Sequence, residues 1–109
     1  MSGESFIERA FESGDDIITA RFLQPILAPG GEYQCRWAIL WPDRVQQRYA
    51  CGVEGVQALM LAMQSVNSAL KESDLYKSGK LTYAGQYDLD LPLSWGEGQL
   101  YVPPERNGS

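Results

Sequence analysis

The chain has 109 residues, of which 44% are hydrophobic, 11% aromatic and 21% charged. This length and composition fit one folded globular domain and exclude a disordered or fibrous chain. Nine basic residues stand against 14 acidic ones, and the resulting net charge of -5 disfavours nucleic acid and anionic membranes as partners. Histidine is absent, which removes the commonest catalytic base and metal ligand.

Targeting signals are missing from the sequence. No run of about 18 apolar residues occurs, and the first five residues lack the basic start and apolar run of a signal peptide. We therefore expect a cytoplasmic protein that does not bind a membrane.

The first half of the chain alternates between apolar and polar residues, which is typical of strands. Residues 5–12 predict a first strand, and their pattern leaves its inward face open. Residues 16–27 predict a second strand with Ile18, Ala20 and Phe22 on its inward face. Pro25 limits the far end of that strand to an edge or a bend.

A β-hairpin is predicted next, with strands over 33–41 and 45–51 and a turn between them. A three-residue loop would pair Trp41 with Val45 and place the apolar residues of both strands on one inward face. Gln47 does not fit this pattern, because the same register turns its polar side chain inward. A slip by one residue would turn other polar residues toward the core.

The same register places Cys35 opposite Cys51, next to Trp37 and Tyr49 on the inward face. Two cysteines are too few for a disulfide framework and lack the spacing of a zinc site. A cross-strand redox pair is the functional alternative. We expect both thiols to be buried, reduced and unlinked.

Between Val53 and Ser73 the period changes, and apolar residues recur at steps of three and four. This pattern predicts a helix of about five turns. Its inward residues would be Val56, Leu59, Met60, Met63, Val66, Asn67 and Leu70. Leu61 and Ala62 widen the apolar sector, so we expect cover on more than one side of the helix.

The end of the chain predicts less structure. Gly79 fits the left-handed cap of the helical region, and residues 81–91 alternate like one more strand, which could be a hairpin around Gly85. The patterns together predict one α+β domain over residues 1–102. In it, an antiparallel sheet of four or five strands packs on one long helix, in the order β-β-β-β-α-β. Residues 103–109 are expected to form a disordered tail.

Residues 52–64 read Gly-Val-Glu-Gly-Val-Gln-Ala-Leu-Met-Leu-Ala-Met-Gln, after the Trp41-Pro42-Asp43 turn and before Ser78-Gly79-Lys80-Leu81. With these residues the chain resembles, over roughly residues 6–92, a family of small bacterial proteins classed as a domain of unknown function. In that family a Gly-Val-Asp-Ser-Val-Gln-Ala-Leu type of helix start follows an antiparallel hairpin, and here Glu54-Gly55 replaces the Asp-Ser pair. The resemblance implies this fold and a cytoplasmic address, and it assigns no catalytic residue.

Several residues that could carry chemistry have simpler structural explanations. Four aromatic residues of the hairpin alternate onto the face that meets the helix, which favours core packing over base stacking. These are Tyr33, Trp37, Trp41 and Tyr49. The acid pair Asp15/Asp16 fits a turn, and the pair Asp88/Asp90 fits the solvent-exposed face of a strand. Both explanations are favoured over a metal or acid–base site. We expect no catalytic, cofactor-binding or metal-binding residues.

Arginines on the outward face of the sheet are the strongest functional signal. The predicted faces send Arg21, Arg36 and Arg48 outward together, joined by Gln34 and Gln46, with Arg9 as a further candidate. Guanidinium groups suit carboxylate and phosphate recognition, whereas the apolar area of Leu23, Ala38 and Leu40 favours a protein partner. Solvated surface charges are the simpler explanation.

These observations predict a non-catalytic protein-interaction or assembly module of a bacterial cytoplasmic protein. Its partner would be another protein or a second copy of itself, bound at the outward face. A small enzyme that uses carboxylates or tyrosine is one alternative, and it would require a deep pocket with two facing carboxylates. A sheet-platform nucleic-acid binder is the other, and it would require exposed aromatic side chains beside Arg36 and Arg48.

Overall fold

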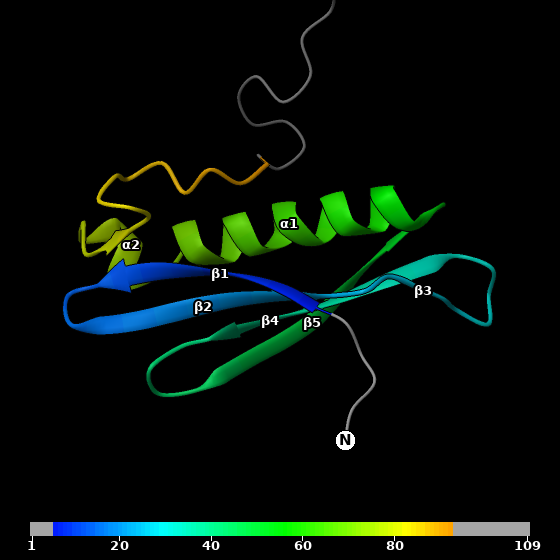
Figure 1. Ribbon diagram of the computed structural model, residues 1–109, viewed down its shortest axis with the longest axis horizontal. Helices are drawn as coiled ribbons and strands as arrows, with labels where there is room; N and C mark the ends of the chain where they lie inside the picture. Colours follow the sequence, from blue (N-terminus) through cyan, green and yellow to red (C-terminus); the bar gives the residue numbers. More distant parts are fainter. Residues whose placement is uncertain (1–5, 93–109) are drawn as a thin grey trace, which may run out of the picture.

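The computed structural model describes residues 6–92 as a sheet covered on one side by a long helix (Figure 1). The strands are β1 (Phe6–Ser13), β2 (Asp16–Leu23), β3 (Ile26–Leu27), β4 (Tyr33–Leu40), β5 (Val45–Gly52) and β6 (Leu81–Thr82). The helices are α1 (Gly55–Lys71) and the one-turn α2 (Asp74–Lys77). This architecture confirms the predicted α+β class, the antiparallel sheet and the single long helix.

Every strand pair in the sheet is antiparallel. β6 pairs with β1, β1 with β2, β2 and β3 with β4, and β4 with β5. The break between β2 and β3 falls at Gln24 and Pro25, and both segments pair with β4. The bend predicted at Pro25 is confirmed, and it splits one predicted strand into two.

Register with β2 settles the inward face of β1. Arg9 pairs with Ala20, and Phe11 pairs with Ile18. Phe11, Ile18 and Ala20 are fully buried. Arg9 therefore lies on the helix side of the sheet. The expectation that Arg9 could join the outward face is wrong, because alternation ties it to the side of Phe11.

The helix α1 packs on β4 and β5 through one stripe of buried residues. Ala58, Ala62, Val66 and Leu70 recur every four residues and have no exposed surface. Val56 and Met60, predicted on the inward face, are instead among the exposed hydrophobic residues. The alanines at the start of this stripe let that end of the helix lie close to the sheet.

The closest approach occurs where β5 ends and α1 begins. A Cβ atom placed on Gly52 would lie 2.5 Å from the backbone nitrogen of Ala58, which is shorter than any normal contact. The Glu54 carboxylate caps the helix there by accepting a hydrogen bond of 2.6 Å from the Gln57 amide. Only glycine fits at position 52.

The register of the β4–β5 hairpin differs from the prediction by one residue. Leu40 pairs with Val45 and Trp37 with Arg48, around a four-residue loop closed by a 2.9 Å bond from the Trp41 amide to the Arg44 carbonyl. The expected pairing of Trp41 with Val45 is therefore wrong. As a result, every residue of β5 lies on the face opposite to the one predicted.

The narrow space between β5 and α1 explains this register. Ala50 and Gly52 face the helix, where their small size permits the close contact. The predicted register would have turned Tyr49 and Cys51 into that space. Trp41 supports the observed register because its indole nitrogen donates a 3.1 Å hydrogen bond to the Gln46 side chain.

After α1 the chain forms α2 and then turns back. Gly79 has a φ of +78°, and bonds from Gly79 to Tyr76 (3.0 Å) and from Lys80 to Leu75 (2.8 Å) form a left-handed cap. Gly79 is thus confirmed as a cap, of α2 rather than α1. Of the strand predicted over 81–91, only Leu81–Thr82 forms. The predicted tail, 103–109, lies outside the described residues, as do 1–5 and 93–102 of the predicted domain.

Two side chains of β1 hold the returning segment in place. The Arg9 guanidinium donates to the carbonyls of Leu89 (3.1 Å) and Asp90 (2.6 Å) and lies over the Tyr83 ring. The Glu12 carboxylate accepts hydrogen bonds from the Thr82 hydroxyl and from the backbone amides of the turn at 84–85. Leu89 is buried as a result of this docking.

The contact at Gly52 gives a first test. Gly52→Ala should lower the free energy of unfolding by about 1–3 kcal/mol, because the added methyl group meets backbone atoms that cannot move aside. Gly55→Ala is the matched control, since its Cβ would lie 3.7 Å from Pro25, an ordinary contact. Urea unfolding of both variants measures the difference, and equal stabilities would contradict the close approach.

The Glu12 carboxylate gives a second test. Its hydrogen bonds, above all the one from the Gly85 amide, hold the pKa of this carboxyl below its ordinary value. A lowered folded-state pKa stabilises the fold above the unfolded pKa of about 4.3, and this stabilisation is lost as pH falls through the folded value. Between pH 6 and pH 3, the thermal midpoint of Glu12→Gln should therefore fall less than that of the parent. Parallel pH profiles would contradict this role.

Candidate functional site

The side of the sheet that faces away from α1 is called here the open face. Strand register assigns alternate residues of each strand to it. These are Phe6, Glu8, Ala10 and Glu12 of β1, Ile17, Thr19, Arg21 and Leu23 of β2, Ile26 of β3, Gln34, Arg36, Ala38 and Leu40 of β4, and Val45, Gln47, Tyr49 and Cys51 of β5.

Large apolar side chains are exposed across the open face. Phe6 is 48% exposed, Ile17 59%, Ile26 44%, Val45 58% and Tyr49 60%. A solvated antiparallel sheet face normally carries polar residues at such positions. The long strands β1, β2 and β5 instead expose large apolar side chains on the open face. Only β4 among the long strands does not.

The charged side chains of the open face balance one another. Glu8 and Arg21 form an ion pair at 3.1 Å, and the Arg21 guanidinium also lies over the Phe6 ring. Glu12 is engaged by the turn at 84–85, and Arg36 lies directly opposite Tyr49. Two carboxylates and two guanidinium groups leave this face with no net charge, in a chain whose net charge is -5.

A hollow of about 370 Å³ opens where the small side chain of Ala38 lies between larger neighbours. Leu23 and Arg36 line one part of it, and Gln47 and Tyr49 line another. Trp37 and Arg48 complete the lining, so the hollow combines apolar side chains with two arginines, and no carboxylate lines it.

The predicted site residues are divided between the two faces of the sheet. Arg21, Arg36 and Gln34 lie on the open face as expected, whereas Gln46 and Arg48 lie on the helix side. The division follows from the corrected register of β5. Arg36 and Arg48 therefore project from opposite faces of the sheet, although both residues line the hollow over Ala38.

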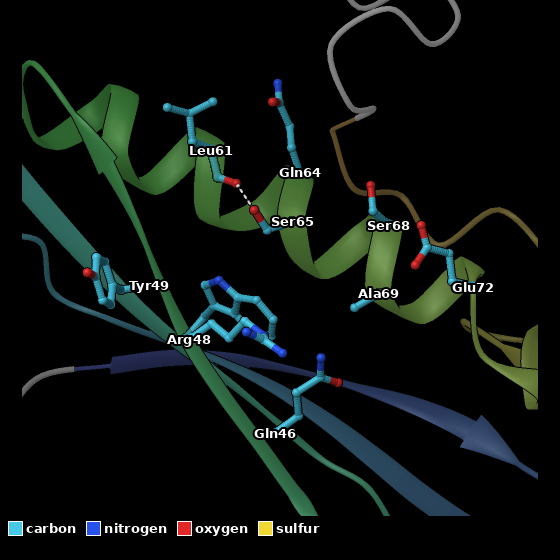
Figure 2. Close-up of a pocket in the computed structure, with 10 residues that line it drawn as sticks. Gln46, Arg48, Tyr49, Leu61, Gln64, Ser65, Ser68, Ala69 and Glu72 are labelled. Carbon is cyan, nitrogen blue, oxygen red and sulfur yellow. Dashed lines mark hydrogen bonds between the residues drawn. The ribbon is translucent and has the colours of Figure 1, made fainter.

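Gln46 and Arg48 instead line a groove of about 430 Å³ between β5 and α1. Figure 2 shows both side chains projecting from β5 to one side, with Tyr49 on the other. The helix contributes polar side chains that include Ser65 and Glu72. Arg48 and Glu72 are the charged residues that line this groove.

One serine of the groove is engaged by the helix backbone. The Ser65 hydroxyl donates its hydrogen bond to the Leu61 carbonyl at 2.9 Å (Figure 2), so its proton is held by the helix backbone. Within residues 6–92, no group of three or more His, Cys, Asp or Glu side chains could hold a metal ion.

A comparison with protein-family models finds a match over residues 7–93, to a family described as a domain of unknown function, DUF6968. The chain belongs to this family. Searches of the curated proteins and of the solved structures find no match. None of the helices in residues 6–92 is long and apolar enough to cross a membrane.

The expected cross-strand cysteine pair does not form in this member of the family. Cys35 lies opposite Ala50 and is buried, with its thiol directed at the Leu23 carbonyl 3.3 Å away. Burial raises the pKa of this thiol. Cys51 is exposed on the open face, so the prediction that both thiols are buried is wrong for Cys51, and the reason is again the register of β5. Both are free, as predicted.

The exposed residues Tyr49, Val45 and Cys51 were missed as members of the outward face. The small residues Ala50 and Gly52 carry the signal that could have placed them, because only a side of β5 with small side chains can approach a helix that starts three residues later. Phe6 was missed for a different reason, since the first strand shows two apolar faces.

The two thiols should differ in reactivity. Cys51 is expected to react with a thiol reagent within seconds to minutes in the folded protein, because it is exposed. Cys35 should react only on unfolding, because it is buried and its pKa is raised. Counting modified thiols before and after addition of denaturant tests this. Two fast thiols, or a disulfide, would overturn the observed register.

Proposed function

We propose that this protein is a non-catalytic interaction module that binds a protein partner through the open face of its sheet. The observation that carries the proposal is the row of exposed apolar side chains between opposite charges on that face. Apolar area interleaved with arginine is typical of protein interfaces. The hollow beside Tyr49 offers a recess for a side chain of the partner.

Protein is favoured over nucleic acid because of charge. Phe6 and Tyr49 are exposed aromatic side chains on the face that carries Arg36, as a stacking platform requires. However, Arg48 points to the other side, and Glu8 and Glu12 offset the positive charge that phosphates need. Nucleic-acid binding remains the second candidate function, with these aromatic residues as its support.

The remaining parts of the proposal rest on the sequence. The bacterial cytoplasmic setting comes from the resemblance noted for residues 52–64, and the absence of histidine disfavours an enzyme. A carboxylate-dependent or tyrosine-dependent enzyme would need facing acidic groups in one cavity. The hollow of the open face has none among its lining residues.

Photo-crosslinking at matched tyrosines tests the proposal. Tyr49 and Tyr87 are equally exposed, at 60% and 61%, but only Tyr49 lies on the open face. With p-benzoylphenylalanine at position 49, illumination of a native lysate should give a discrete adduct. The same group at position 87 should give none. Arg36→Glu should abolish the adduct, whereas Arg48→Glu on the opposite side should preserve it.

Three results would reject the proposal. The first is equal labelling from both positions, and the second is the absence of any adduct at position 49. The third is an adduct that is lost on nuclease treatment, which would support nucleic-acid binding instead.

A further inference from the structure

We infer that the occupant of the open face is a second copy of this chain, packed face to face about a two-fold axis. This inference rests on the proposed use of the open face and adds the identity of the partner. It is argued from the charge, the area and the shape of that face.

Charge is the first argument. A two-fold interface places one surface patch against itself, so a stable contact needs both signs within the patch. The open face carries Glu8 and Glu12 on β1, with Arg21 on β2 and Arg36 on β4. Two acidic and two basic groups cancel on this face, so a rotated copy meets no net charge of like sign there. The excess negative charge of the chain lies elsewhere and does not oppose association at this face.

Area is the second argument. Four strands of eight residues form most of the open face. At about 4.8 Å between strands and about 3.3 Å per residue, they present roughly 500 Å². Two such faces bury about 1,000 Å² in total, which is the lower limit for a specific protein interface. An interface at this limit fits a weak, reversible dimer, and we expect it to dissociate in the micromolar range.

Shape is the third argument. The hollow over Ala38 lies beside the exposed side chain of Tyr49, so the face contains both a recess and a projection. A surface with both features can be complementary to its own copy, and a face that was only flat or only convex could not. Burial of the exposed apolar residues in this contact would explain why this side of the sheet carries apolar side chains where a solvated face would carry polar ones.

Mass in solution tests the inference on the full chain. The weight-average mass from light scattering should rise from 12.2 kDa toward twice that value as concentration increases from the micromolar range to several hundred micromolar. Tyr49→Asp should raise the dissociation constant about a hundredfold, because the two-fold axis places the new charge in the interface twice. Arg36→Glu should also weaken association.

The controls use the same residue types on other surfaces. Tyr87→Asp and Arg48→Glu should dimerise like the parent, and thermal midpoints establish that all four variants fold. A parent that stays monomeric at every concentration would overturn the inference. A crosslinked adduct to a different protein would then still support the proposed function. A dimer that survives Tyr49→Asp and Arg36→Glu would place the contact on another surface and also overturn it.

Discussion

The close contact between Gly52 and Ala58 determines how the helix meets the sheet, and most of the surface follows from it. Two residues connect β5 to α1, so the helix starts directly over the end of the strand. The side of β5 that carries Ala50 and Gly52 must face the helix, because larger side chains would not fit. Alternation then turns Gln46 and Arg48 to the same side. A packing constraint therefore decides which charges reach the open face.

Much of the fold is readable from the sequence because its elements are long and periodic. The inward residues Ile18, Ala20 and Phe22 of β2 and the helix were predicted and confirmed. The strand expected over 81–91 shows where periodicity is insufficient. Alternation indicates that one side of a segment is buried, but it does not indicate whether a neighbouring strand is available. β1 pairs with this segment only at Glu12 and Ser13, and the rest docks through side chains.

The candidate site was only partly predictable, because it depends on an outer strand. A central strand has a neighbouring strand on each side, so its inward side chains are covered. Its apolar residues therefore mark the inward face reliably. Within residues 6–92, β5 has a neighbouring strand on one side only, and its helix-facing side borders a groove that Gln46 and Arg48 line. Val45 and Tyr49 could then lie outward. Arg21, Arg36 and Gln34 were placed correctly because their strands have neighbours on both sides.

The same register bears on how two copies would meet. Among the strands of residues 6–92, β5 is an outer one, and a free strand edge can add a strand from another molecule. A two-fold pairing centred on β5 would bring the Arg48 side chains of both copies together, and like charges at adjacent strand positions repel. Inward-pointing charges of this kind protect sheet edges from pairing. The open face has no such obstacle, since its guanidinium groups are matched by carboxylates. The position of Arg48 in the groove thus disfavours association through the edge, which agrees with the proposal that the open face is the contact surface.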